Sequence, residues 1–338
     1  MDTPLVWVQL AGIAVVILVA AHFLAGAAGA ISARTGLGRS FIGVVLLATA
    51  TSLPELATGV SSVTLVGEPD LAAGDAFGSN LFNLLIIALL DLVWRRGPIL
   101  TVVGPTSVVI GTIGAATIGL AAIAIAIHGA TDVGSGWPVS PFSMALLLVF
   151  GVGMYAIYRY DTPERATDPA DHERPKESVS GLPRAVGTYA AAGAVVVGAS
   201  VALSVTGQQL ADAMGWETSF VGTQFLALST SLPELATSFA AIRLRLPEMA
   251  ISNLLGSNLF NMGVVLFLDD VAYTEGALWS VVSPVHVLTG LVAVAMTSIV
   301  ILALVRRPRG RPIRQWTWEA AALVTLYAGV SVMVFRLG

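Results

Sequence analysis

The chain has 338 residues, of which 56% are hydrophobic and only 11% are charged, and its mean hydropathy is +0.83. A soluble domain carries about 25% charged residues, so this composition indicates a polytopic helical membrane protein. The absence of cysteine excludes disulfides and thiolate metal sites. The pI of about 5.5 argues against a nucleic-acid partner.

Ten apolar segments follow one another, each near the roughly 20 residues that a helix needs to cross a bilayer. The first five are Leu5–Ile31, Phe41–Val66, Leu71–Val93, Val102–Ile127 and Phe142–Tyr158. The second five are Val186–Thr206, Phe220–Ile242, Pro247–Leu268, Val281–Val305 and Trp316–Phe335. We therefore expect an all-α protein with a five-helix repeat at 1–158, a linker at 159–185 and a second five-helix repeat at 186–338.

The basic residues support this count. When the loops are placed on alternate sides of the membrane, all of the 17 Lys and Arg residues except Arg336 fall on the side of the linker. The positive-inside rule makes that side cytoplasmic. We expect a multi-pass protein of the plasma membrane, with both termini outside.

Two peptides occur twice in the chain. Thr-Ser-Leu-Pro-Glu-Leu-Ala-Thr stands at 51–58 and 230–237, and Gly-Ser-Asn-Leu-Phe-Asn follows at 78–83 and 256–261. Because each half has an odd number of helices, the second half enters the membrane in the opposite orientation. The sequence thus predicts two inverted repeats related by a pseudo-two-fold axis in the membrane plane.

Each octapeptide places a proline and a glutamate inside an apolar segment. Pro54 and Pro233 have no N–H, so a carbonyl four residues earlier loses its helical donor. Such carbonyls are tolerated at membrane depth where they line a cavity or are buried in protein. Glu55 and Glu234 are candidate functional residues, because ionisable side chains are expensive in a bilayer. The same helical face carries the threonine four residues before each glutamate, Thr51 or Thr230.

The hexapeptides add further oxygen atoms on the next helix. Ser79 and Asn83 share one face, as do Ser257 and Asn261. All of these candidate ligand atoms are oxygens, which suit Ca²⁺ and Na⁺. The two glutamates supply about two negative charges, which one Ca²⁺, two Na⁺ or two protons can neutralise. A site that needs compensation in either case is a physical basis for exchange.

Asp75 adds a third carboxylate to this region. It lies one turn before Ser79 on the same face, where the second half has Asn253. Two interpretations stay open: Asp75 takes a proton, or it is a paired structural group.

These residues resemble the two alpha repeats of the sodium/calcium exchanger branch of the cation/Ca²⁺ antiporter superfamily, of the prokaryotic type. The resemblance implies that Glu55 and Glu234 are the principal Ca²⁺ ligands, with the carbonyls of Thr51 and Thr230. It implies flanking Na⁺ sites at Ser52, Ser231, Ser79 and Ser257 and at the carbonyls of Ala48 and Ala227. It places Asn83 and Asn261 at a middle site. The first and sixth helices would slide across the other eight to alternate access.

Two positions depart from the family pattern. Asn261 stands where some relatives have Asp, and in the potassium-dependent branch that Asp is tied to K⁺, so we expect no coupling to K⁺. Asp75 stands where the family usually has Asn.

The leading interpretation is therefore a Na⁺/Ca²⁺ antiporter, a monomer in the lipid membrane without cofactors. An H⁺/Ca²⁺ antiporter would use the same glutamates, but the paired serines favour Na⁺, because proton exchange needs no extra oxygen ligands. A cation channel is a further alternative, although inverted repeats with broken helices suit alternating access better. An intramembrane metallohydrolase would need His ligands, and none lies near either glutamate in the sequence.

Overall fold

The computed structural model describes residues 3–35, 50–131, 137–160, 181–307 and 317–337, and all regular secondary structure in these ranges is helical. Eight helices there are long and apolar enough to span a membrane. They are α1 (Thr3–Thr35), α4 (Pro69–Val93), α5 (Thr106–Ala130), α6 (Pro141–Tyr160), α7 (Leu182–Met214), the run α11 (Pro247–Phe260), η5 (Asn261–Val265) and α12 (Leu266–Ala272), α13 (Val285–Arg306) and α14 (Trp318–Leu337).

A ninth span is broken. It consists of α8 (Thr218–Val221), η4 (Gly222–Leu226), α9 (Ala227–Thr230) and α10 (Leu232–Arg243), with a bend of 43° before α10. The predicted span 41–66 is represented by α3 (Leu53–Ser61) and η1 (Ser62–Val66), and its positions 41–49 lie outside the described residues. The count of ten and the inverted repeat therefore stay predictions.

Helix α7 is longer than its apolar segment predicts. It begins at Leu182, inside the predicted linker, and continues to Met214 past the apolar residues. Pro183 is tolerated there because N–H groups in a first turn have no helical partner. The left-handed Gly215, at φ 64°, ends the helix. Hydropathy alone misses both ends, because the additional turns are polar.

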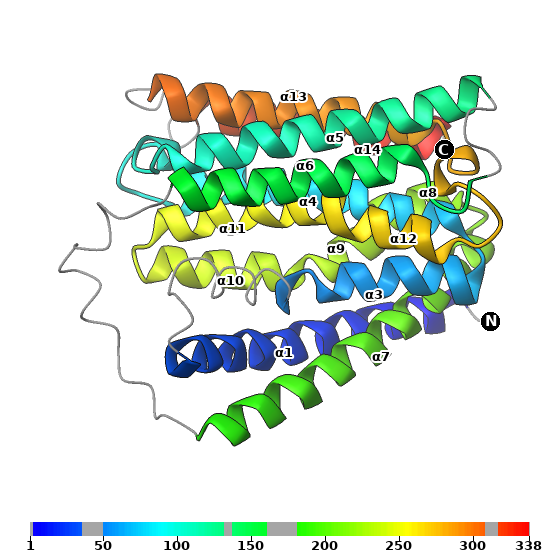
Figure 1. Ribbon diagram of the computed structural model, residues 1–338, viewed down its shortest axis with the longest axis horizontal. Coiled ribbons are helices and arrows are strands. Elements are labelled where there is room, and N and C mark those ends of the chain that lie inside the picture. Colours follow the sequence, from blue (N-terminus) through cyan, green and yellow to red (C-terminus); the bar gives the residue numbers. More distant parts are fainter. Residues whose placement is uncertain (1–2, 36–49, 132–136, 161–180, 308–316, 338) are drawn as a thin grey trace.

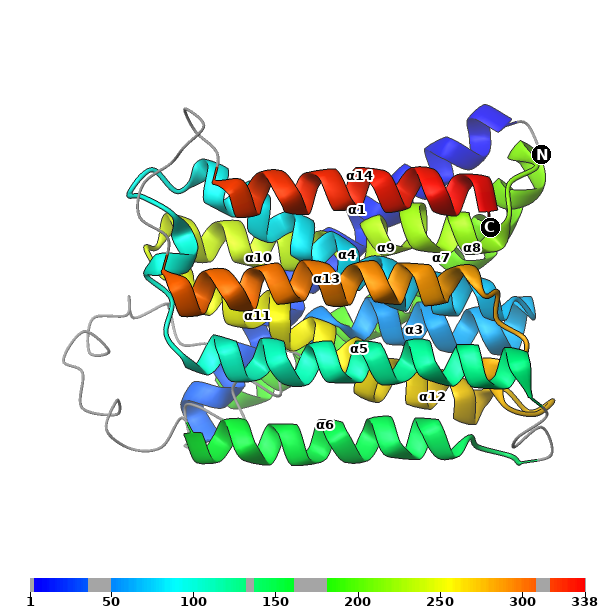
Figure 2. The ribbon, with the colours of Figure 1, turned by 90° about the horizontal axis from the view of Figure 1, so that it is seen from above.

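The helices lie side by side along the longest axis of the molecule (Figures 1 and 2). Helices α1 and α7 form a pair at one side, α4 and α11 occupy the centre, and α5, α13 and α14 lie on the opposite side (Figure 1). The start of α1 and the end of α14 are at the same end of the molecule, opposite the end of α6 and the start of α7 (Figure 1). This arrangement agrees with the predicted common side for both termini.

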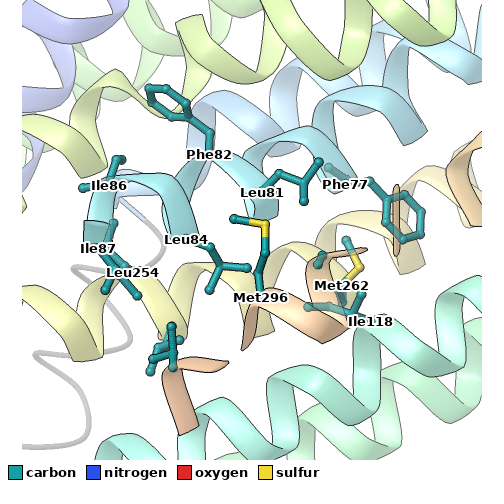
Figure 3. Close-up of a cluster of buried hydrophobic side chains, with 14 of the residues drawn as sticks. Phe77, Leu81, Phe82, Leu84, Ile86, Ile87, Ile118, Leu254, Met262 and Met296 are labelled. Atoms are coloured by element: carbon teal, nitrogen blue, oxygen red, sulfur yellow. The ribbon is translucent and has the colours of Figure 1, made fainter. Parts of the chain in front are cut away.

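Helix α4 is the centre of the main hydrophobic core, and 78% of its apolar 18-residue stretch is buried inside the protein. Figure 3 shows how its side chains point into the surrounding helices. The core around it includes Ile118 of α5, Leu254 of α11, Met262 of η5 and Met296 of α13. A helix surrounded by others buries residues on every side, and α4 buries the polar residues Asp75, Ser79, Asn80 and Asn83 together with its apolar ones.

Two buried aspartates hold matching turns at the ends of α4 and α12. Asp91 Oδ1 accepts a hydrogen bond at 2.7 Å from the first N–H of η2 (Ile99–Thr101). Asp270 Oδ1 accepts the matching bond at 2.7 Å from the first N–H of η6 (Leu278–Ser280). The second oxygen of each aspartate accepts a hydrogen bond from a hydroxyl, that of Thr317 or Ser143. Both carboxylates are thus structural.

Gly78 lets α4 approach the broken span closely. A Cβ atom at Gly78 would lie 2.7 Å from the Cα of Thr223 and 2.7 Å from the Cβ of Ala227, and it would also meet the Thr223 carbonyl. The backbones of α4 and the broken span therefore approach each other closely at Gly78. At Gly256, its counterpart in the second hexapeptide, such a Cβ would meet no heavy atom of the described residues within 4 Å.

The different surroundings of Gly78 and Gly256 predict opposite effects of a glycine-to-alanine substitution on stability. We expect Gly78→Ala to destabilise the protein by about 1–3 kcal/mol, because the neighbouring backbone must shift. Gly256→Ala adds a methyl group in open space and should be neutral or stabilising by up to about 1 kcal/mol. Thermal unfolding in detergent measures both, and equal melting temperatures for the two variants would contradict the packing at Gly78.

Candidate cation site

The repeated octapeptides lie at two helix breaks. Ser52 (φ −95°, ψ 8°) precedes α3, and Ser231 (φ −88°, ψ 6°) precedes α10, with a proline in the first turn of each helix. The break that each proline predicts is thus confirmed. Helices α3 and α10 both begin near the middle of the molecule and run toward opposite ends (Figure 1). Their amino-terminal ends favour negative charge, and each carries its glutamate in the first turn.

Glu55 and Glu234 are fully buried between the two halves of the chain. Ser231 donates a hydrogen bond to Glu55 Oε1 at 3.1 Å, and Ser257 donates one to Glu234 Oε1 at 3.3 Å. The Oε2 atom of each glutamate has no hydrogen-bond partner within the described residues. Each carboxylate also interacts with a hydroxyl of the first half, Ser79 for Glu55 and Thr51 for Glu234. Each glutamate therefore keeps one oxygen available to a ligand.

Asp75 joins this site through a threonine of the other half. The Thr230 hydroxyl lies 2.9 Å from Asp75 Oδ1 and 3.3 Å from the Ser79 hydroxyl. Asp75 Oδ2 has no hydrogen-bond partner in the part of the chain that the structure describes. The bond to Thr230 supports the structural interpretation of Asp75 for one of its oxygens only.

Four asparagines link the halves at the centre. Asn83 donates to Asn258 Oδ1 at 3.0 Å, and Asn261 donates to Asn80 Oδ1 at 3.5 Å. Asn258 also donates to the Asn80 carbonyl at 3.2 Å. The Oδ1 atoms of Asn83 and Asn261 have no partner inside the described ranges. Their amide nitrogens are therefore held by protein, while their oxygens are available as ligands.

Asn80 and Asn258 are residues that the sequence reasoning missed. They stand third in the two hexapeptides, so the repetition itself is the signal that could have found them. In each hexapeptide the serine and the second asparagine are four residues apart and share one helical face, so this spacing does not select the first asparagine. Asn80 and Asn258 lie on another face of their helices, and their role is to hold the amides of the opposite half.

The other expected site residues occupy the same region. Ser52 is fully buried, and its hydroxyl has no partner among the residues described. The Ala227 carbonyl accepts the Ser231 N–H at 3.1 Å, and the Thr230 hydroxyl lies 3.3 Å from the same oxygen. Ala48 lies outside the described residues. Within the described ranges no three acidic or histidine side chains converge on one point, so a cation here would rely on amide, hydroxyl and carbonyl oxygens as well.

A group of carboxylates surrounds the start of α4. Partial burial, together with the neighbouring charges of Asp70 and Asp212, raises the pKa of Glu68. Asp70 accepts hydrogen bonds from the Ser283 N–H at 2.6 Å and from His286 Nε2 at 3.1 Å. This end of the molecule is therefore acidic, which favours the approach of cations.

Comparison with known proteins identifies relatives across the whole chain. A family model described as sodium/calcium exchanger protein matches residues 5–160 and 184–336. The chain is 28% identical over 267 residues to CaxA of Alkalimonas amylolytica, covering 76% of this chain and 77% of that protein.

Two solved structures share the fold. The structure of the H⁺/Ca²⁺ exchanger CAX has a TM-score of 0.68 at 14% identity, and the alignment covers 98% of this chain and 86% of that one. A structure of the sodium-calcium exchanger NCX_Mj has a TM-score of 0.63 at 19% identity, with 98% of both chains covered. At these identities the likeness is one of fold alone.

The asparagine contacts predict a stability effect that is separate from ion binding. Asn258→Ala leaves the Asn83 amide nitrogen without its partner, and an unsatisfied buried group costs about 1–3 kcal/mol. We expect a clearly lower melting temperature of the ion-free protein in detergent. Asn253→Ala is the matched control, because Asn253 is only partly buried and makes a longer bond of 3.3 Å to Thr237. Equal melting temperatures for the two variants would contradict the proposed link between the halves.

Proposed function

Because the chain belongs to the sodium/calcium exchanger family, we propose that it is a secondary active antiporter that exchanges Na⁺ for Ca²⁺ by alternating access. The observation that carries this proposal is the pair of buried glutamates, each with one carboxylate oxygen not used by the described protein. Hydroxyls and amides from both halves surround them. The protein is a transporter in this proposal and not an enzyme.

The charge of the two glutamates explains why exchange would be coupled. Two uncompensated carboxylates in a dry membrane interior are strongly unfavourable. One Ca²⁺ or two Na⁺ can each supply the missing positive charge, and both ions prefer oxygen ligands. A conformational change with the site uncompensated is therefore costly, so transport of one ion requires the return of the other.

Each predicted site residue has a role in this proposal. Glu55 and Glu234 hold Ca²⁺, with the backbone carbonyls of Thr51 and Thr230. The flanking Na⁺ positions use the hydroxyls of Ser52, Ser231, Ser79 and Ser257 and the carbonyls of Ala48 and Ala227. The middle position uses the side-chain oxygens of Asn83 and Asn261, and their lack of another partner in the described part of the chain supports this assignment.

Alternating access would come from the pair α1 and α7. These helices lie together at one side of the molecule (Figure 1). They pack through two small hydrophobic clusters that are separate from the core around α4. Gly26, Gly29 and Gly187 are exposed on this pair. Contact through small separate clusters suits a pair of helices that slides as a unit.

Coupling to protons is the second candidate. Asp75 supports it, because a third buried carboxylate next to the glutamates could carry a proton. The solved structure of an H⁺/Ca²⁺ exchanger has the same fold, so the architecture is compatible with either driving ion. The paired serines favour Na⁺, since they supply oxygen ligands that proton exchange does not need.

The glutamates give the first test of this function. Glu55→Gln and Glu234→Gln each remove about half of the compensating charge while keeping the size of the side chain. We expect each variant to reach the membrane and to lose Ca²⁺ uptake in reconstituted vesicles down to background. Near-normal uptake by either variant, at an equal amount of inserted protein, would refute its assignment as a Ca²⁺ ligand.

Comparison of the wild type with Asp75→Asn tests whether Na⁺ or protons drive the exchange. In wild-type proteoliposomes we expect an outward Na⁺ gradient at constant pH to drive Ca²⁺ uptake, and a pH gradient without Na⁺ to drive little. We expect Asp75→Asn to keep its Na⁺-driven uptake, because the paired serines are unchanged. Full-rate uptake driven by the pH gradient alone, lost in Asp75→Asn, would identify a proton-coupled antiporter instead.

A further inference from the structure

Asp269 is a buried carboxylate that the proposed exchange site does not use. It is fully buried in α12, and neither of its oxygens has a hydrogen-bond partner within the residues described. The adjacent Asp270, by contrast, accepts three hydrogen bonds at 2.6–2.8 Å. An unpaired buried carboxylate costs several kcal/mol unless a proton or a cation compensates it. Asp269 therefore requires a ligand or a proton, whereas Asp270 does not.

Asp269 lies against the helix that carries Glu55 of the central site. A Cβ atom at Gly59 would lie 2.6 Å from both Asp269 oxygens, so the carboxylate packs directly against α3. Gly59 is one turn after Glu55 on that helix. Helix α4, which carries Asp75, packs against both α3 and α12. Glu55, Asp75 and Asp269 thus lie on three helices that contact one another, and Asp269 contacts α3 one turn beyond Glu55.

These carboxylates lie on the side of the centre that faces one end of the molecule. From Glu55, α3 runs toward the end of the molecule that holds the start of α1 and the end of α14 (Figure 1). Basic-residue placement predicts that this end is outside the cell. Along α3 the buried hydroxyls of Thr58 and Ser62 also have no partner in the described ranges. They supply further oxygen atoms on the same route.

Neither Asp75 nor Asp269 has an acidic counterpart at the matching position in the other half of the chain. Asn253 stands where the first half has Asp75. Counting back from the matched aspartates Asp91 and Asp270, the position of Asp269 is occupied by Leu90. The interval from Asn261 to Asp270 is also one residue longer than that from Asn83 to Asp91, and the π-helix η5 lies within the longer interval. Such π segments are frequent at functional sites.

We propose that Asp75 and Asp269 form an outer subsite for a divalent cation of the Ca²⁺ type, on the route between the central glutamates and the outer face. This inference rests on the proposed function for its role in transport. Two carboxylates match the charge of one divalent ion, and hard oxygen ligands suit Ca²⁺. The central glutamates are supplemented by hydroxyl and amide oxygens from both halves, so we expect the subsite to bind Ca²⁺ more weakly than the centre does.

Equilibrium binding of radiolabelled Ca²⁺ to the purified full chain tests the subsite without requiring exchange. In the background Glu55→Gln/Glu234→Gln, which removes the central charge, we expect weak binding to persist. Adding Asp269→Asn should lower the affinity of this residual binding by about tenfold or more. Adding Glu275→Gln, which removes an exposed carboxylate from the loop after α12, should leave it unchanged.

Two results would overturn the subsite. One is the absence of residual binding in the Glu55→Gln/Glu234→Gln background, and the other is an unchanged affinity after Asp269→Asn. If Asp269→Asn does not fold, Gly59→Ala replaces it, because the added methyl group displaces the Asp269 carboxylate and keeps both charges. It too should lower the residual affinity by about tenfold. A protein that binds in this way but does not exchange Na⁺ for Ca²⁺ would refute the proposed function and leave the subsite intact.

Discussion

The burial of two carboxylates in the middle of the helix bundle is the constraint on which the rest of the structure depends. Glu55 and Glu234 lie in the first turns of α3 and α10, where the positive ends of two helices face the centre. Helix ends and hydroxyls offset part of the cost of burial, but neither supplies a full positive charge. The remaining cost makes the site a receptor for cations and couples their movements.

This constraint explains why so many contacts near the centre join one half of the chain to the other. Ser231 donates a hydrogen bond to Glu55, and Thr230 donates one to Asp75. The four asparagines form hydrogen bonds with one another across the halves. Gly78 allows α4 to lie against the broken span closely enough for the bond between Thr230 and Asp75. A ligand set divided between two halves can change its geometry when they move relative to each other, which is what alternating access requires.

The sequence was sufficient to predict those features of the fold that show as repeated peptides or as apolar segments. The duplicated octapeptide predicts both helix breaks, and the structure has them before Pro54 and Pro233. It could not predict which polar residues meet in space, since contacts such as Asn83 with Asn258 depend on packing between distant helices. The prediction that Asp269 and Asp270 lie in an outer loop was wrong, because they directly follow the apolar segment that ends at Leu268, whereas the structure continues the helix to Ala272. Both aspartates are fully buried, and their hydrogen bonds in the described structure are what separates the unpaired Asp269 from Asp270.

If one set of oxygen ligands serves both ions, Ca²⁺ and Na⁺ must exclude each other from the centre. Titration of Na⁺ against radiolabelled Ca²⁺ bound to the purified protein at constant pH and ionic strength tests this claim most directly. The account predicts that Na⁺ displaces the tightly bound Ca²⁺ with a Hill coefficient above one, because more than one Na⁺ is needed to replace its charge. Tight Ca²⁺ binding that is indifferent to Na⁺ would contradict a shared site.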